Sequence, residues 1–151
     1  MTARLCHAVV TPLNFLGGFL PHLALRFLLA YEFGVAGLEK WHGTNWFADI
    51  QDRFPVPFNL VPADISWALA TWVELLGAAA LIIGLATRVV SASLIVLTVV
   101  AWMSVHAGLG YNVCDNGFKL PLIYLVLLLP LLLQGPGRVS VDYYLRRKWC
   151  R

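Results

Sequence analysis

The sequence predicts an all-α, polytopic membrane protein, a bundle of four transmembrane helices with an interfacial amphipathic helix between the first and the second. Composition is the first observation behind this prediction. Of the 151 residues, 60% are hydrophobic and only 13% are charged, whereas soluble domains carry about 25% charged residues. With a mean hydropathy of +0.74, the chain has too few polar side chains to cover a soluble surface. We therefore expect a single membrane domain over residues 1–151, with the lipid bilayer as its surroundings.

The length of the apolar runs is the second observation. A helix rises 1.5 Å per residue, so about 20 residues cross the hydrocarbon layer of about 30 Å. The second and third runs are separated only by Gly84, Thr87 and Arg88, which predicts a tight helical hairpin. The fourth run is shorter, unless its helix begins near Asp115 or Asn116. The predicted spans are about residues 21–41, 65–86, 89–108 and 118–134.

The distribution of bases is the third observation. An even number of spans places both termini on one side of the membrane, and Lys and Arg mark the cytoplasmic side. The side of the termini carries seven bases and the other side three, which predicts cytoplasmic termini. The bases on the side of the termini are Arg4, Arg88, Arg138, Arg146, Arg147, Lys148 and Arg151, and those on the other side are Lys40, Arg53 and Lys119. Because the basic tail is short and adjoins the membrane, nucleic-acid binding is not expected.

Two further segments are expected at the membrane surface. Pro12, Asn14 and Pro21 interrupt the apolar residues of the N-terminal segment, so we expect a short cytoplasmic-side interfacial segment and no cleaved signal peptide. The loop of about residues 42–64 has an amphipathic helical pattern that ends at its prolines. We interpret it as a surface anchor in the outer interface, with a lid over the bundle as the alternative. Its apolar face consists of Trp46, Phe47, Ile50 and Phe54.

Three ionisable residues within the spans form a candidate intramembrane polar site: Arg26 and Glu32 in the first span and Glu74 in the second. Charged groups are costly there, which makes them candidates for function. Both glutamates are expected near the midplane. Arg26 and Glu32 point about 120° apart on one helix, so they are not expected to pair. Arg26 could instead meet Glu74 across a helix interface, or extend toward the cytoplasmic surface.

Small residues surround Glu74 at spacings of three and four, and they allow close helix packing. They are Ala70, Thr71, Gly77 and Ala78. Glu74 is therefore expected to face a helix contact or a cavity. Two interpretations stay open: a carboxyl group that takes up and releases a proton, or a neutral carboxyl group that joins helices by hydrogen bonding.

A candidate site on the outer face consists of Lys40, His42, His106 and Cys114. The two histidines and Cys114 could form a soft metal site. None of them has metal-ligand spacing, so no metal is assigned and copper has only weak support. Cys6 and Cys150 are predicted on the opposite side from Cys114, and the chain has no CxxC motif, so a dithiol reaction within one chain is not expected. No catalytic motif was found, and catalytic residues stay unassigned.

Several segments together resemble the DoxX family of small four-helix bacterial membrane proteins. These are Arg26, Ala36-Gly37-Leu38-Glu39-Lys40-Trp41, Glu74-Leu75-Leu76-Gly77, Gly84-Leu85-Ala86-Thr87-Arg88 and Gly135-Pro136-Gly137-Arg138-Val139-Ser140-Val141-Asp142. Their order and spacing make the set fairly specific over residues 22–142. The loop 45–60 is similar to a DoxX branch linked to the maturation of copper-binding modified peptides. Among the ionisable candidates, Arg26, Lys40 and Glu74 match recurrent family positions, whereas Glu32 does not.

The resemblance implies a multi-pass protein of the bacterial inner membrane that acts as a subunit or accessory, with a protein partner or as a homo-oligomer. Family associations include a thiosulfate:quinone oxidoreductase and a complex against thiol stress. The leading hypothesis is a redox or stress-pathway subunit with a quinone-like site between the first two helices, lined by Arg26 and Glu74. The alternative is a non-enzymatic anchor or chaperone for the maturation or export of a metal-binding peptide. A proton-linked transporter is a third interpretation.

Overall fold

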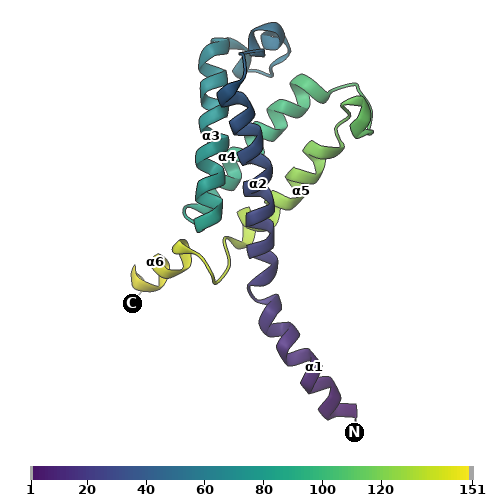
Figure 1. Cartoon of the computed structure of the whole chain (residues 1–151), viewed down its shortest axis with the longest axis vertical. Helices are drawn as coiled ribbons and strands as arrows, with labels where there is room; N and C mark the ends of the chain where they lie inside the picture. Colours follow the sequence, from purple (N-terminus) through teal and green to yellow (C-terminus); the bar gives the residue numbers. More distant parts are fainter. Residues whose placement is uncertain (1, 150–151) are drawn as a thin grey trace.

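The computed structural model describes residues 2–149, and these are helical without a β-strand. The body consists of α2 (Leu20–His42), α3 (Ala63–Ile83), α4 (Thr87–Ala101) and α5 (Lys119–Gln134). Both termini lie at the end of this body that is lowest in Figure 1, and the long α2–α3 loop lies at the opposite end. We call these the lower and the upper end.

Three stretches of the described chain are long and apolar enough to cross a membrane: 10–42, 63–83 and 87–106. This confirms the all-helical membrane class. The fourth apolar helix, α5, has 16 residues. It begins at Lys119 and not near Asp115, because Asn116 turns the chain in the left-handed conformation (φ 56°). A fourth crossing therefore stays a prediction.

A tight turn joins α3 to α4, where the sequence predicts a hairpin. Gly84 ends α3 in the left-handed conformation (φ 70°), and its N–H donates to the Ala80 carbonyl. α4 begins three residues later at Thr87. Beyond Ala101, α4 continues as a π-helical turn over Trp102–His106.

Leucines from all four helices of the body form its core. Leu29 of α2, Leu81 of α3, Leu94 of α4 and Leu128 and Leu131 of α5 have no exposed surface. Large apolar side chains also cover much of the outside of the same helices. An apolar exterior around an apolar core is what a lipid environment permits.

The loop predicted to be an amphipathic helix forms two short 3₁₀ helices, η1 (Phe47–Arg53) and η2 (Phe58–Leu60). Phe54 is buried, and its ring contacts Phe47, which in turn contacts Trp67 of α3. Part of the predicted apolar face therefore packs against the protein itself. Whether this loop also lies in the headgroup layer stays a prediction.

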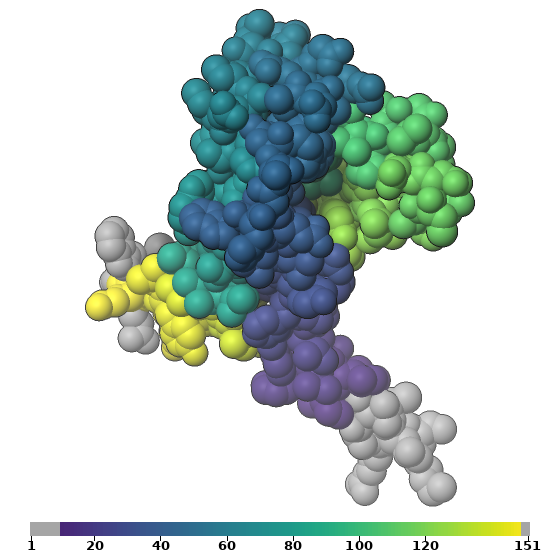
Figure 2. Space-filling model, turned by 45° about the horizontal axis from the view of Figure 1, so that its top comes forward, coloured from purple at the N-terminus to yellow at the C-terminus, as the bar shows by residue number. Residues whose placement is uncertain are grey.

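The two ends of the chain project from the body (Figures 1 and 2). α1 (Thr2–Gly17) continues below α2 after a break at Gly17 and Gly18, where the N–H of Gly18 donates to the Asn14 carbonyl. Leu13 and Phe15 of α1 are 60% and 67% exposed. α6 (Val141–Trp149) leaves the lower end sideways. The interfacial role predicted for the N-terminal segment stays a prediction.

Candidate functional site

α2 and α3 approach closely in the upper half of the body because Gly37 lies at their contact. A Cβ atom on Gly37 would lie 2.9 Å from Leu75 Cγ and 3.1 Å from Glu74 Cβ. Gly34, one turn lower on α2, faces Ala78 in the same way, at 3.5 Å. The small residues that the sequence shows on both helices therefore bring Glu74 against α2.

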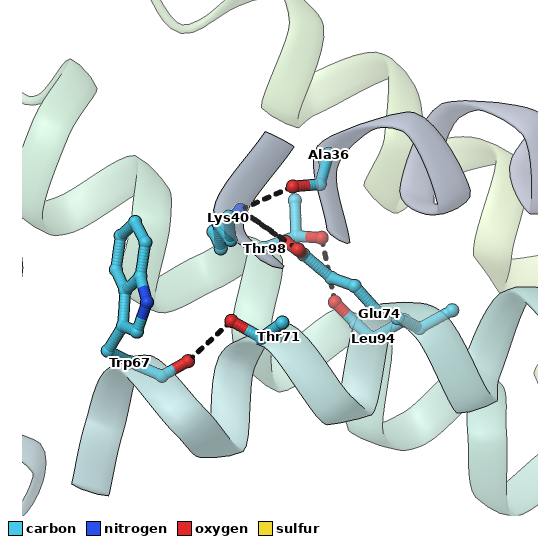
Figure 3. A network of polar contacts seen from close by, with 7 residues as sticks. All are labelled: Ala36, Lys40, Trp67, Thr71, Glu74, Leu94 and Thr98. Atoms are coloured by element: carbon cyan, nitrogen blue, oxygen red, sulfur yellow. Dashed lines mark hydrogen bonds and ion pairs between the residues drawn. The ribbon is translucent and has the colours of Figure 1, made fainter. Parts of the chain in front are cut away.

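The partner of Glu74 is Lys40 (Figure 3). The Lys40 Nζ atom lies 2.9 Å from both carboxylate oxygens of Glu74, and it is 3.5 Å from the Ala36 carbonyl oxygen. Glu74 is 2% exposed, whereas the Lys40 side chain is 16% exposed. The two nearby hydroxyl groups donate to backbone carbonyls and not to Glu74: Thr71 to the carbonyl of Trp67, and Thr98 to the carbonyl of Leu94. Lys40 thus neutralises a carboxylate that would otherwise be buried alone.

A pocket of about 310 Å³ opens beside this ion pair at the upper end. Trp46 and Trp67 are among the residues that line it, and their indole rings stand edge to face with centroids 6.0 Å apart. The complete lining is Ala36, Glu39, Lys40, Gly43, Thr44, Trp46 and Trp67. Lys40 therefore links the buried carboxylate to a partly apolar pocket that a small molecule could enter.

Arg26 does not meet Glu74. Its guanidinium lies at the lower end and donates to the carbonyl oxygens of Leu81 (2.7 Å), Ile82 (2.6 Å), Pro136 (3.3 Å) and Val139 (2.5 Å). The last carbonyls of a helix have no partner within the helix, and Arg26, 2% exposed, supplies donors to those of α3. The suggested Arg26–Glu74 contact is therefore wrong. The Arg26 side chain does reach the lower end, but it stays buried there among backbone carbonyls.

Three of the segments that carry the family resemblance meet around Arg26, and we call this place the Arg26 junction. A Cβ atom on Gly84 would lie 2.5 Å from Ser140 Cβ and 2.8 Å from the Arg26 guanidinium. The Asp142 carboxylate accepts from the N–H groups of Ala86 (2.7 Å) and Thr87 (2.8 Å). Asp142 thereby caps α4 from a distant part of the chain. The junction holds the C-terminal segment to the α3–α4 turn.

Glu32 lies neither at the Lys40–Glu74 pair nor at the Arg26 junction. Its Oε2 atom accepts a hydrogen bond of 2.7 Å from the Tyr124 hydroxyl group of α5. Both side chains are half-buried. Glu32 therefore joins α2 to α5, and the three residues of the predicted intramembrane polar site occupy three separate surroundings.

Of the four residues predicted on the outer face, the structure brings only Lys40 to the pocket. His42 Nδ1 bonds to the Leu38 carbonyl (3.0 Å), and His106 Nδ1 bonds to the Asn116 carbonyl (2.6 Å). Cys114 is an exposed free thiol. Among residues 10–148, whose side chains the structure describes, no group of three or more His, Cys, Asp or Glu side chains is arranged to hold a metal ion. A metal site made of His42, His106 and Cys114 is therefore not formed.

Sequence reasoning missed the Lys40–Glu74 pair, and with it the pocket. The available signal was the packing of small residues, because Gly37 and Glu74 must lie at one level if the small stripes of α2 and α3 meet. Lys40 is one helical turn above Gly37, within reach of a long side chain. Trp46, which the sequence places on the apolar face of the loop, lines the pocket together with Trp67.

The model of the DoxX family matches residues 22–107. This range includes Arg26, Lys40, Glu74 and the α3–α4 turn. A protein of Haemophilus influenzae, described as uncharacterized, is 58% identical over 125 residues, which cover 83% of each chain. No solved structure matches the chain significantly. This chain belongs to the DoxX family of membrane proteins.

Proposed function

We propose that this DoxX protein is a multi-pass subunit of a redox or stress-protection pathway in the bacterial inner membrane, and that it binds a quinone-like molecule in the upper pocket. The observation that carries the proposal is the junction of a buried Lys40–Glu74 ion pair with a pocket walled by Trp46 and Trp67. The site lies between α2 and α3, the first two predicted spans. Its charged lining residues are Lys40 and Glu39, and Glu74 lies behind Lys40 as its ion-pair partner; Lys40 thus takes the place that the sequence-based hypothesis gave to Arg26.

The chemistry of the pocket suits a quinone head group. Ligand pockets commonly have volumes of about 300–1,000 Å³, apolar walls and a few polar groups, and the pocket of about 310 Å³ falls at the lower end of that range. Indole rings offer aromatic surface to a flat ring. The Lys40 ammonium group can donate a hydrogen bond to a quinone carbonyl, and its charge favours the negative charge that reduction places there.

Reduction of a quinone to a quinol takes up two electrons and two protons. In this proposal a partner redox protein supplies the electrons. Lys40 can pass one proton to a quinone oxygen while Glu74 holds its ammonium group in position, and Lys40 then regains a proton from water in the open pocket. The same water supplies the second proton of the quinol. The chain then acts as the membrane subunit that presents the quinone, with a protein partner that carries the redox centre.

The proposed topology has four crossings and cytoplasmic termini. Both termini lie at the lower end in Figure 1, which an even number of crossings requires. Arg138, Arg146, Arg147 and Lys148 belong to the same end, in agreement with the rule that bases mark the cytoplasmic side. The 16 residues of α5 measure about 24 Å, so a crossing by α5 needs a locally thinner bilayer.

Quinone binding is tested by quenching of tryptophan fluorescence in the detergent-solubilised protein, with decylubiquinone as the probe. We expect saturable quenching in the wild type, and a loss of at least tenfold in affinity in Lys40→Met and in Trp67→Phe. Lys119→Met is the matched control, because Lys119 is also at the upper end but lies over the Tyr111 ring, 5.6 Å from its centroid. Equal affinities in wild type, Lys40→Met and Trp67→Phe would refute the assignment of the pocket.

A second candidate function, the anchor or chaperone for a metal-binding peptide, is favoured by the tip of the upper loop. Val56 and Leu60 are 77% and 76% exposed there. Such side chains could contact an exported peptide or its maturation enzyme. Val56→Ser with Leu60→Ser should then abolish co-purification of that partner without any change in quinone affinity. Unchanged co-purification would leave the loop as a surface anchor in the membrane.

A further inference from the structure

α6 is a helix that the body does not cover. It leaves the lower end sideways in Figure 1 and forms a lobe separate from α1 in Figure 2. Residues 143–148 are exposed along its length. Among them, Tyr144 and Leu145 are 66% and 45% exposed. A helix with this much uncovered surface needs surroundings other than the bundle.

The start of α6 is nevertheless held firmly. Its second residue, Asp142, caps α4 through both carboxylate oxygens, and its N–H donates to the Gly84 carbonyl at 3.0 Å. Immediately before α6, the Ser140 hydroxyl group donates to the Gly137 carbonyl and accepts from the Tyr143 N–H. The direction of α6 is therefore set by the Arg26 junction, which keeps it across the lower end of the body.

The side chains of α6 are divided between two faces. Val141, Tyr144 and Leu145 stand at spacings of three and four, so they share one side of the helix. Arg146 and Arg147 point to the other side, together with Tyr143. Lys148, seven residues after Val141, lies on the apolar side itself, from which its long stem can reach outward to the head groups. This is the pattern of a helix that lies in the plane of a membrane surface, with aromatic and aliphatic side chains toward the acyl chains.

The charge of this segment is strongly one-sided. Arg138, Arg146, Arg147 and Lys148 are exposed bases. Asp142 is the acid of residues 138–148, and its carboxylate is already bonded to α4. Clusters of four or more bases next to a membrane bind anionic lipid head groups, at about 1 kcal/mol for each base.

We propose that α6 lies on the membrane surface at the lower end and binds the phosphate groups of anionic phospholipids through Arg146, Arg147 and Lys148. The proposal does not depend on a quinone in the upper pocket. Phosphatidylglycerol is the probe, because it combines a phosphate diester with a net negative charge. The phosphatidylglycerol head groups lie at the membrane surface, directly above the acyl chains that Val141, Tyr144 and Leu145 would contact.

The test uses the full chain in neutral detergent micelles with increasing amounts of phosphatidylglycerol. Native mass spectrometry measures the lipid concentration at which half of the protein retains bound lipid. Arg146→Gln with Arg147→Gln and Lys148→Gln should raise this midpoint about 100-fold, from the combined loss of three bases. The matched control is Arg53→Gln with Lys119→Gln, which removes two bases of the upper end and should leave the midpoint within twofold.

Further arms separate a lipid surface from other anions. Tyr144→Ser with Leu145→Ser keeps the charges and removes the apolar face, and it should raise the midpoint several-fold. Phosphatidylcholine should be retained at least tenfold more weakly, and millimolar inorganic phosphate should not displace phosphatidylglycerol. An unchanged midpoint in the triple variant would overturn the proposal, as would complete displacement by inorganic phosphate. A protein partner whose co-purification needs the three bases, while lipid retention does not, would also overturn it.

Discussion

Replacement of Lys40 by methionine tests whether the Lys40–Glu74 pair holds α2 against α3. Methionine fills much of the same volume but carries no charge. In the wild type, both carboxylate oxygens of Glu74 lie 2.9 Å from the Lys40 ammonium group. Glu74 is 2% exposed, so water cannot replace the lost ammonium group. The substitution therefore leaves a buried carboxyl group without its cation.

The size of the effect follows from two limits. Removal of one partner from a buried ion pair costs about 3–5 kcal/mol. The carboxyl group can instead take up a proton, and for a glutamate with the ordinary pKa of about 4.3 this costs about 3.7 kcal/mol at pH 7. Protonation thus sets a ceiling, and we expect a loss of about 3 kcal/mol in the free energy of unfolding at pH 7. At pH 5 the same ceiling is about 1 kcal/mol.

The pH dependence has a definite sign. Folded Lys40→Met holds a proton on Glu74 that the unfolded chain releases at neutral pH. The variant therefore gains stability relative to wild type as the pH falls from 7 to 5. Glu74→Gln should cost less, about 1–2 kcal/mol, because the glutamine oxygen still accepts from Lys40 and the partly exposed ammonium group can turn into the pocket. The double variant Lys40→Met with Glu74→Met should return to within about 1 kcal/mol of wild type, since paired apolar replacements are often neutral.

The assay is unfolding in mixed micelles with increasing sodium dodecyl sulfate, followed by helical circular dichroism at pH 7 and pH 5. Arg53→Met, which removes an exposed base of η1, is the control for the loss of a positive charge. The reasoning is refuted if Lys40→Met costs less than 1 kcal/mol at pH 7, or costs the same at both pH values. It is also refuted if the double variant loses the sum of the two single losses.

Four further predictions concern the Arg26 junction and the topology. Arg26→Lys should lower the free energy of unfolding by about 3 kcal/mol in the same assay, because one ammonium group cannot serve the carbonyls of both α3 and residues 136–139; wild-type stability would contradict this. Gly84→Ala should cost about 2–3 kcal/mol, because Gly84 has a positive φ and a Cβ atom there would lie 2.5 Å from Ser140 Cβ. Gly108→Ala should cost only about 1–2 kcal/mol, because Gly108 has a similar φ but open space around it. Equal losses would contradict the close approach at Gly84. Asp142→Ala should cost about 1–2 kcal/mol through loss of the α4 cap, and Asp142→Asn clearly less; identical losses would show that no capping oxygen matters. Cys114 is exposed at the upper end. In a variant with Cys6 and Cys150 replaced by serine, it should react with a membrane-impermeant maleimide in intact cells. Labelling only after lysis would reverse the proposed orientation.

The helical body could be predicted from the sequence because each helix is an apolar run bounded by polar residues or glycine. The predicted span 65–86 contains most of α3, and the predicted span 118–134 coincides with α5 to within one residue. The structure of the α2–α3 loop was harder to predict from the sequence. The spacing of Phe47, Ile50 and Phe54 suggests an α-helix, but Phe47 and Phe54 also fit a 3₁₀ helix that folds back onto Trp67. Contacts with a distant tryptophan cannot be read from local periodicity.

The pairing of the ionisable residues was hard to predict for a related reason. Depth along the membrane places Arg26, Glu32 and Glu74 only approximately, and a long side chain can reach a helical turn in either direction. The Lys40 side chain extends from the upper end of α2 to Glu74 of α3, and the Arg26 side chain extends from α2 to the last carbonyls of α3. The partners of Arg26 are backbone carbonyls, which every residue carries and which sequence therefore does not distinguish. What decides the pairing is the level at which Gly37 meets Glu74, a property of the packed helices.

The arrangement of charges within the body argues against the proton-linked transporter and for two independent ends. On α2, Leu29 and Phe33 separate Arg26 from Lys40, and both are buried in the leucine core. On α3, Ala78 and Leu81 of the same core lie between Glu74 and the carbonyl of Ile82 to which Arg26 donates. A proton pathway from Lys40 to Arg26 along the α2–α3 contact would have to pass this apolar layer. Glu32, the titratable side chain of α2 at this level, is turned away from that contact and bonds to Tyr124 of α5. The upper end, with a pocket beside an ion pair, is therefore suited to bind a ligand. Arg26 at the lower end donates from all three guanidinium nitrogens to backbone carbonyls and is suited to hold the chain together. Substitutions at the two ends should consequently separate, since Trp67→Phe would change quinone affinity and leave the Arg26 junction intact, whereas Asp142→Ala would weaken that junction at wild-type quinone affinity.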